Sequence, residues 1–293
     1  MPETPAGPAP FAVPGPPLRN PVVVAAFEGW NDAGEAASQA VAHLHEVWGA
    51  EDLLELDPEE YHDFQVNRPM VDYDEDGRRR LTWPTTKVSY ARLPDASRDV
   101  LLVRGIEPSM RWRTYSQELV RAARDNGASL VLTLGALLAD VPHTRPLPVT
   151  SSSDDDELVE SMGVEPSRYE GPTGIVGVVQ DAVARAGIPS VSLWAAVPHY
   201  VGQPPSPKGT LALLHRVEEV LDISVPLGDL PEDARAWERG VDELAGEDAE
   251  IAEYVQQLEE AKDTAELPEA SGEAIAREFE RYLRRRDDPP RRG

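Results

Sequence analysis

Short apolar runs that alternate with amphipathic segments restrict the fold of this chain more than any other feature. Residues 21–27 form such a run, with no polar side chain and the length of one strand, which indicates a strand buried on both faces. The alternation continues to residue 221 and predicts an α/β fold with a mainly parallel central sheet flanked by helices. The expected strands are 21–27, 99–105, 129–135 and 190–197, and the expected helices are 33–48, 110–124, 174–186 and 209–221.

Two stretches within this region follow other patterns. Residues 53–93 contain short pieces of alternating hydrophobicity separated by turn residues, which predict an antiparallel insertion or a sheet edge. Ser151, Ser152 and Ser153 lie beside acidic residues rather than beside a base. We therefore expect them to form a loop and the cap of a short helix.

The C-terminal part of the chain is strongly acidic. Residues 229–280 contain 18 Asp or Glu and 4 Lys or Arg, which is more than half of the formal net charge of −25. A four–three spacing of apolar residues predicts amphipathic helix over 232–262, with Asp248 at the one position that breaks the spacing. A last helix is expected from Ser271 to Leu283, ending in three arginines at 284–286. The predicted divisions are a flexible proline-rich segment (1–20), an α/β domain (21–226) and an acidic helical appendage (227–293).

Charge and composition exclude several classes of function. A surface with 53 acidic and 28 basic residues repels phosphate backbones and anionic membranes, so we expect no nucleic-acid or membrane partner. The sequence lacks a run of about 20 apolar residues and a secretory signal, which predicts a soluble, cytoplasmic protein. With no cysteine there is no thiolate nucleophile, disulfide or thiolate metal site. We expect neither a metal nor a cofactor.

Candidate site residues follow the predicted parallel strands. Loops at the carboxyl ends of such strands emerge along one edge of the sheet, where small ligands normally bind. This edge collects Glu28 and Asp32 after the first strand, and His143 and Arg145 after the third. Three of them also have a structural explanation: Asp32 as a helix cap, His143 as a hydrogen-bonding loop residue, and Arg145 as the partner of one of the many acids.

A glycine-rich segment, Tyr169-Glu-Gly-Pro-Thr-Gly-Ile-Val-Gly177, precedes one of the predicted helices. Gly171, Thr173 and Gly174 would let a phosphate approach the backbone amides at the start of that helix. The segment has neither dinucleotide nor P-loop spacing, so close packing of the helix through glycine is the competing explanation. The sequence contains no G-x-S-x-G motif either, and we assign no catalytic residue.

Five segments together resemble the PAC2 (proteasome assembly chaperone 2) family, in its actinobacterial branch. They are residues 27–37, 135–146, 169–177, 198–200 and 207–214, and the resemblance extends over about residues 20–225. It implies a sheet similar to that of the purine nucleoside phosphorylase fold. It also implies homo-oligomers, for which we expect a trimer, and a role as a chaperone that guides proteasome subunits into rings.

The resemblance further implies docking through a C-terminal tail of a hydrophobic residue, a tyrosine and any residue. The sequence ends instead in Pro290-Arg-Arg-Gly293, so the acidic helices are the alternative interaction surface.

Two hypotheses of different classes follow. We favour a non-enzymatic oligomeric scaffold of the PAC2 family that binds other proteins, with proteasome subunits as candidate partners. The alternative is an enzyme, nucleoside-phosphorylase-like or an ATP-dependent ligase, that binds an anionic small molecule at the strand edge. Its binding residues would be Glu28, Asp32, His143, Arg145, Gly171, Thr173 and Gly174.

Overall fold

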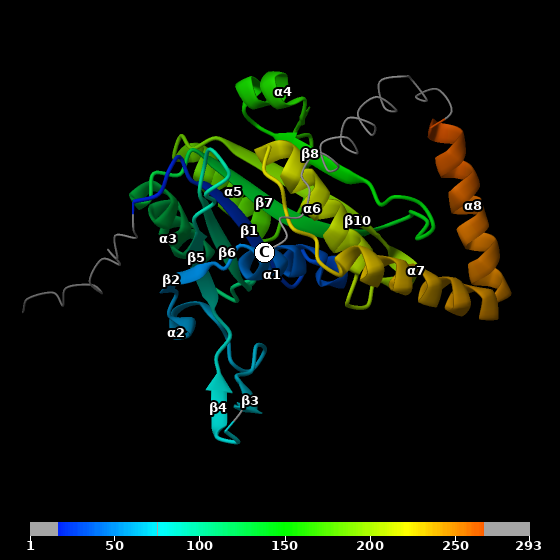
Figure 1. Ribbon diagram of the computed structural model, residues 1–293, viewed down its shortest axis with the longest axis horizontal. Helices are drawn as coiled ribbons and strands as arrows, with labels where there is room; N and C mark the ends of the chain where they lie inside the picture. The colour runs from blue at the N-terminus through cyan, green and yellow to red at the C-terminus, as the bar shows by residue number, and fades with distance from the viewer. Residues whose placement is uncertain (1–16, 75, 267–293) are drawn as a thin grey trace, which may run out of the picture.

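The computed structural model describes residues 17–74 and 76–266, and its centre is an eight-stranded mixed sheet (Figure 1). The strand order is β2-β5-β6-β1-β7-β10-β8-β9. The strands are β1 (Val22–Glu28), β2 (Glu51–Glu55), β5 (Thr86–Ala91), β6 (Val100–Ile106), β7 (Leu130–Ala139), β8 (Val149–Ser153), β9 (Glu165–Pro166) and β10 (Ser190–Pro198), and β3 (Met70–Tyr73) and β4 (Arg79–Thr82) form a separate pair.

The four central strands, β6, β1, β7 and β10, are parallel. They correspond to the four apolar runs of the sequence, and residues Val22–Phe27 of β1 are all buried, as expected for a strand covered on both faces. Both edges are completed by antiparallel strands, with β5 against β6 on one side and β8 against β10 on the other. The predicted α/β fold with a mainly parallel centre is confirmed.

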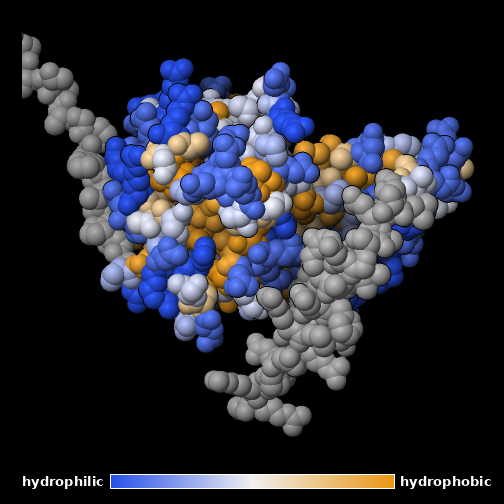
Figure 2. Space-filling model, turned by 90° about the horizontal axis from the view of Figure 1, so that it is seen from above, coloured by the Kyte–Doolittle hydropathy of each residue, from blue (hydrophilic) through white to orange (hydrophobic). Residues whose placement is uncertain are grey.

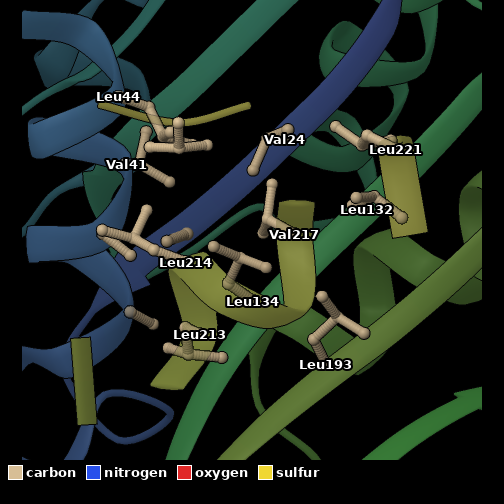
Figure 3. Packing of buried hydrophobic residues seen from close by; sticks show 14 of the residues in the cluster. Val24, Val41, Leu44, Leu132, Leu134, Leu193, Leu213, Leu214, Val217 and Leu221 are labelled. Carbon is tan, nitrogen blue, oxygen red and sulfur yellow. The ribbon is translucent and has the colours of Figure 1, made fainter. Parts of the chain in front are cut away.

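Helices cover both faces of the sheet. On one face α1 (Ala36–Val47) and α6 (Pro207–Leu221) pack against β1, β7 and β10, and leucines and valines from all five elements interlock (Figure 3). On the other face α3 (Trp112–Asp125) and α5 (Ile175–Arg185) cover a second apolar cluster that contains Phe27 and Tyr115. The shorter helices are η1 (Ala33–Glu35), α2 (Pro58–Tyr61), α4 (Asp156–Met162) and η2 (His199–Val201).

Residues 53–93, predicted as an antiparallel insertion or a sheet edge, contain both an edge strand and an antiparallel insertion. Strands β2 and β5 pair with each other at the edge of the main sheet. Between them, β3 and β4 form a hairpin that projects away from the body of the molecule (Figure 1).

The prediction for the three serines was wrong in part, because Ser151–Ser153 form the end of β8. Ser153 Oγ donates to the carbonyl of Ser190 at 2.7 Å, and Ser151 Oγ accepts from Arg216 of α6 at 2.7 Å. Because these positions of the strand are polar, its hydrophobic signal is weak. The short helix after them is present as α4, but its N-cap is Asp155, whose carboxylate accepts from the amides of Glu157 and Leu158.

The predicted helix over 232–262 is two helices, α7 (Leu230–Glu247) and α8 (Ala249–Glu266), which we call the arm. The break falls at Asp248, the residue that interrupts the apolar spacing. Its backbone is extended, and its carboxylate accepts from the amide of Glu250 at 2.9 Å, so that it starts the second helix as an N-cap. On the face seen in Figure 2 the outer end of the arm is mostly hydrophilic, whereas apolar residues lie between it and the body.

A buried carboxylate fixes the chain just before β1. Asp99 is almost fully buried and accepts from the backbone amide and the guanidinium of Arg19, both at 2.7 Å, and from the amide of Leu93 at 3.1 Å. Burial alone would raise the pKa of Asp99, but these hydrogen bonds outweigh it and hold the pKa below its usual value. The chain therefore enters the sheet at a fixed point on its amino-end edge.

The remaining sequence predictions concern segments that are only partly covered. Most of the proline-rich segment 1–20 and the whole helix expected from Ser271, with its three arginines, lie outside the described residues. The domain boundary at residue 226 stays a prediction. No helix within residues 17–74 and 76–266 is long and apolar enough to cross a membrane.

Candidate functional site

The candidate residues lie along the edge where the parallel strands end. Glu28 at the end of β1 pairs with Ile106 at the end of β6, and Ala139 of β7 pairs with Pro198 of β10. The hairpin leaves from the same edge, because Thr86 of β5 pairs with Gly105 of β6. We call this edge the rim, and it comprises residues 28–35, 62–74, 76–85, 106–111, 137–148, 169–174 and 198–206.

At the β1 and β6 side of the rim a carboxylate occupies the start of a helix. Glu107 Oε1 accepts from the backbone amide of Ile175, at the N-terminus of α5, at 2.8 Å and from Asn31 Nδ2 at 3.0 Å. The neighbouring Glu28 is paired with Arg104 at 3.2 Å. Because the positive end of a helix dipole attracts an anion, Glu107 takes the place at α5 that a phosphate would otherwise use.

The glycine-rich segment packs closely against this group. A Cβ at Gly174 would lie 2.2 Å from Asn31 Nδ2, so only glycine fits between the helix and the first rim loop. Gly171 has a φ of +154°, and Tyr169 beside it donates its hydroxyl to the carbonyl of Pro172 at 2.7 Å. Thr173 is exposed. In this arrangement Gly174 provides close helix packing, which was one of the two explanations offered by the sequence.

Asp32 caps a helix, although one turn further on than expected. Helix α1 begins at Ala36 after the short turn η1, and the Asp32 carboxylate accepts from the amides of Ala37 at 2.7 Å and Ser38 at 3.3 Å. The side chain is buried, and this burial raises the pKa of the carboxyl even though the amide hydrogen bonds act in the opposite direction. Both oxygens face the helix, so Asp32 serves the fold.

At the other side of the rim His143 is buried, and its backbone amide and both ring nitrogens have hydrogen-bond partners. Its backbone amide donates to the hydroxyl of Tyr200 at 2.8 Å, and its Nδ1 lies 2.8 Å from the same oxygen. Its Nε2 lies 3.0 Å from Asp242 of α7. In the neutral imidazole the Tyr200 O–H donates to Nδ1 and the Nε2–H donates to Asp242. Burial raises the pKa of Tyr200 to about 12, so that hydroxyl stays protonated in the neutral range.

Arg145 is held by two acids of the arm. Its guanidinium makes a two-pronged contact with Asp263, at 2.9 and 2.8 Å, and a third contact with Glu259 at 3.3 Å. The hydrogen bond from Arg145 lowers the pKa of the Asp263 carboxyl. The neighbouring Thr144 also donates to Glu259. Arg145 thus fastens α8 to the rim.

Further contacts join the arm to the same part of the rim. Lys208 at the start of α6 donates to the carbonyl of His143 and pairs with Glu238 of α7. Tyr254 of α8 donates to Asp140 at 3.0 Å and packs edge-to-face against the ring of Tyr200, with the centroids 6.0 Å apart. The arm therefore covers the carboxyl ends of β7 and β10.

The predicted site residues thus fall into two groups. Glu28, Asp32 and Gly174 belong to the first rim loop and the start of α5, whereas His143 and Arg145 face the arm. The sequence reasoning did not identify their partners Asp242, Glu259 and Asp263. The one signal for these partners in the sequence was the high number of acidic residues in the arm. It indicates that a carboxylate is available to His143 and Arg145 but does not identify which one.

The chemistry that this arrangement leaves available is limited. The guanidinium, the imidazole and the helix N-terminus that would bind an anion are each occupied by a side chain of the protein itself. Trp30, which follows β1, is 67% exposed. Among residues 17–74 and 76–266, no three His, Cys, Asp or Glu side chains are grouped so that they would hold a metal ion.

The mixed sheet lies between two helical layers, and a helical arm covers the carboxyl ends of β7 and β10, so the molecule is an α/β protein with a helical addition at that edge. A family model described as "PAC2 family" matches residues 26–245, which is most of the chain. The chain belongs to the PAC2 family.

Solved structures agree with this assignment. A PAC2 family protein from Streptomyces avermitilis is 59% identical, with a TM-score of 0.76, and the match covers 80% of this chain and 99% of that one. A proteasome-assembly chaperone homologue from Mycobacterium tuberculosis is 55% identical, with a TM-score of 0.72 and the same coverage. An archaeal homolog of proteasome-assembly chaperone from Pyrococcus furiosus, at 19% identity, a TM-score of 0.56 and coverage of 84% and 97%, shares the fold. No curated protein matches the chain.

Proposed function

We propose that this chain is a non-enzymatic, self-associating scaffold of the PAC2 family that acts in the cytoplasm and binds proteasome subunits while they assemble. The observation that carries the proposal is the internal pairing at the rim. Arg145 is bound by Asp263 and Glu259, and the N-terminus of α5 is bound by Glu107. These groups would have to be released before they contact a substrate, whereas a protein partner needs only an exposed surface.

The likeness to a proteasome-assembly chaperone homologue at 55% identity supports the choice of partner. The charge adds a second argument. An acidic arm attracts basic protein surfaces and accelerates encounter with them, and this effect weakens as salt rises. A trimer is the subunit number that we propose.

The test is direct binding between purified proteins. The full chain is mixed with purified proteasome subunits from the same organism, and the mixture is analysed by native mass spectrometry and by size-exclusion chromatography at low and high salt. We expect a complex of defined stoichiometry whose yield falls with salt. Absence of any complex under both conditions would refute the choice of partner.

The enzymatic alternative is tested with the same material. Isothermal titration with inorganic phosphate, ATP and a purine nucleoside measures whether the rim binds an anion, with Arg145→Ala as the matched variant. We expect no heat of binding. Saturable binding that Arg145→Ala abolishes would overturn the scaffold proposal.

A further inference from the structure

The exposed apolar side chains of this protein are concentrated on the rim. Within the described part of the chain, twelve large hydrophobic residues are exposed, and eleven of them lie in rim segments. They are Trp30, Val66, Met70, Val71, Tyr73, Leu81, Trp83, Met110, Leu137, Leu138 and Tyr169. A concentration of this kind marks an interaction surface, because scattered surface residues would be spread over all sides. The twelfth residue, Leu244, lies on α7 of the arm and is 63% exposed.

The hairpin carries the clearest part of this surface. Val71 faces Leu81 and Tyr73 faces Arg79 across the two strands, so these four side chains share one face. Trp83 follows the end of β4 and packs its ring against Phe64, with the centroids 4.9 Å apart. Tyr73 is 71% exposed, and Tyr, Trp and Arg are the residues that most often dominate binding energy in protein interfaces. We call Val71, Tyr73, Arg79 and Leu81 the hairpin face.

The opposite face of the hairpin is different. There Asp72 accepts from Arg80 in a two-pronged ion pair, at 3.0 and 2.6 Å. That face also carries Met70, which is 68% exposed. Among the described residues, β3 and β4 pair only with each other. Because an isolated two-stranded hairpin is at best marginally stable in water, its apolar face needs a cover that the body of the same chain does not provide.

Charge complementarity indicates which surface binds the hairpin face. The arm carries 13 acidic and three basic residues over 230–266, and Leu244 lies there between Glu243 and Glu247, which are both exposed. On the hairpin, Arg80 pairs with Asp72 and Arg78 with Asp76, while no ion pair joins Arg79 to an acid of the described residues. An apolar face that carries Arg79 is complementary to an apolar residue flanked by glutamates.

The two surfaces cannot meet within one chain. The hairpin projects from one end of the molecule and the arm from another, and the two lie well apart in Figure 1. We propose that the hairpin face of one copy docks on the outer face of α7 in a second copy, around Leu244. Such a contact joins two different surfaces, so it repeats from copy to copy and closes into a ring when the rotation permits.

This inference rests on the self-association in the proposed function and is independent of proteasome binding. It is tested by charge reversal on the purified full chain. Arg79→Glu and Glu247→Arg are each expected to raise the dissociation constant of the oligomer at least about tenfold, and the double variant is expected to recover most of the loss. Arg92→Glu and Glu232→Arg are controls that change the net charge equally at other places. Native mass spectrometry and light scattering measure the oligomer.

A second experiment uses the absence of cysteine in the chain. Tyr73→Cys and Leu244→Cys variants are mixed and oxidised, and we expect a disulfide-linked pair of chains that Tyr73→Cys with Glu232→Cys does not form. If the protein is an oligomer but neither the cross-link nor the charge rescue occurs, the hairpin–arm contact is wrong and self-association stands. If the purified chain is a monomer at every concentration, both are wrong.

Discussion

Removing the hydroxyl of Tyr200 tests whether the rim is held together by the hydrogen bonds around His143. Tyr200→Phe keeps the ring and its packing against Tyr254 but deletes one oxygen. That oxygen accepts from the His143 amide and lies 2.8 Å from its Nδ1. His143 is 1% exposed, so water does not readily replace the lost partner.

The size of the effect follows from this burial. Leaving a buried donor without a partner costs about 1–3 kcal/mol, which for a chain of this size corresponds to a fall in Tm of roughly 2–5 °C. The assays are denaturant unfolding and hydrogen exchange. Exchange is expected to rise in residues 141–145 and in α7, because the Nε2 of the same imidazole holds Asp242.

The matched control is Tyr169→Phe. Tyr169 also uses its hydroxyl in a hydrogen bond, to the carbonyl of Pro172, but the side chain is 70% exposed. Its loss should change the free energy of unfolding by less than about 0.5 kcal/mol. If the two variants lose the same stability, the reasoning that links burial at His143 to the strength of the rim is refuted.

Three further outcomes are expected. Burial raises the pKa of Asp32, so ionisation of its carboxyl opposes folding. The free energy of unfolding of the wild type, relative to that of Asp32→Asn, should therefore fall as pH rises above about 4. Parallel pH profiles of the two proteins would contradict this. Gly174→Ala should cost about 1–3 kcal/mol in denaturant unfolding because its Cβ meets Asn31, whereas Gly240→Ala on the exposed side of α7, with nothing within 4 Å, should stabilise by about 0.5–1 kcal/mol. Arg145→Ala should speed hydrogen exchange in α8 while the global stability changes by less than about 1 kcal/mol, and unchanged exchange would show that the arginine does not fasten the helix.

The layered sheet was predictable from the sequence because burial on both faces leaves a signal in each strand. The run at 21–27 contains only apolar residues, and such a run is compatible with few positions other than the centre of a parallel sheet. Strand β8 was missed because serines occupy three of its five positions, which removes the hydrophobic pattern.

The site was predictable only as a set of candidates. Strand order brings Glu28, His143 and Arg145 to one edge, and this follows from the topology alone. Which acid pairs with Arg145 depends on where the arm folds back, and the acidic helices offer many equivalent carboxylates. Long-range pairing between similar residues leaves no local pattern in a sequence. The break at Asp248 was visible as a gap in the apolar spacing, although the spacing does not reveal that the gap separates two helices.

The anchoring of Arg19 by Asp99 determines from which side the molecule is best attached to a surface. An affinity label placed ahead of residue 17 connects to the protein at the amino-end edge of the sheet, opposite the rim. Immobilisation through that label would therefore leave the hairpin and the carboxyl ends of the strands facing the solution. Captured in this orientation, the protein presents a partner with the same surface on every molecule of the sensor.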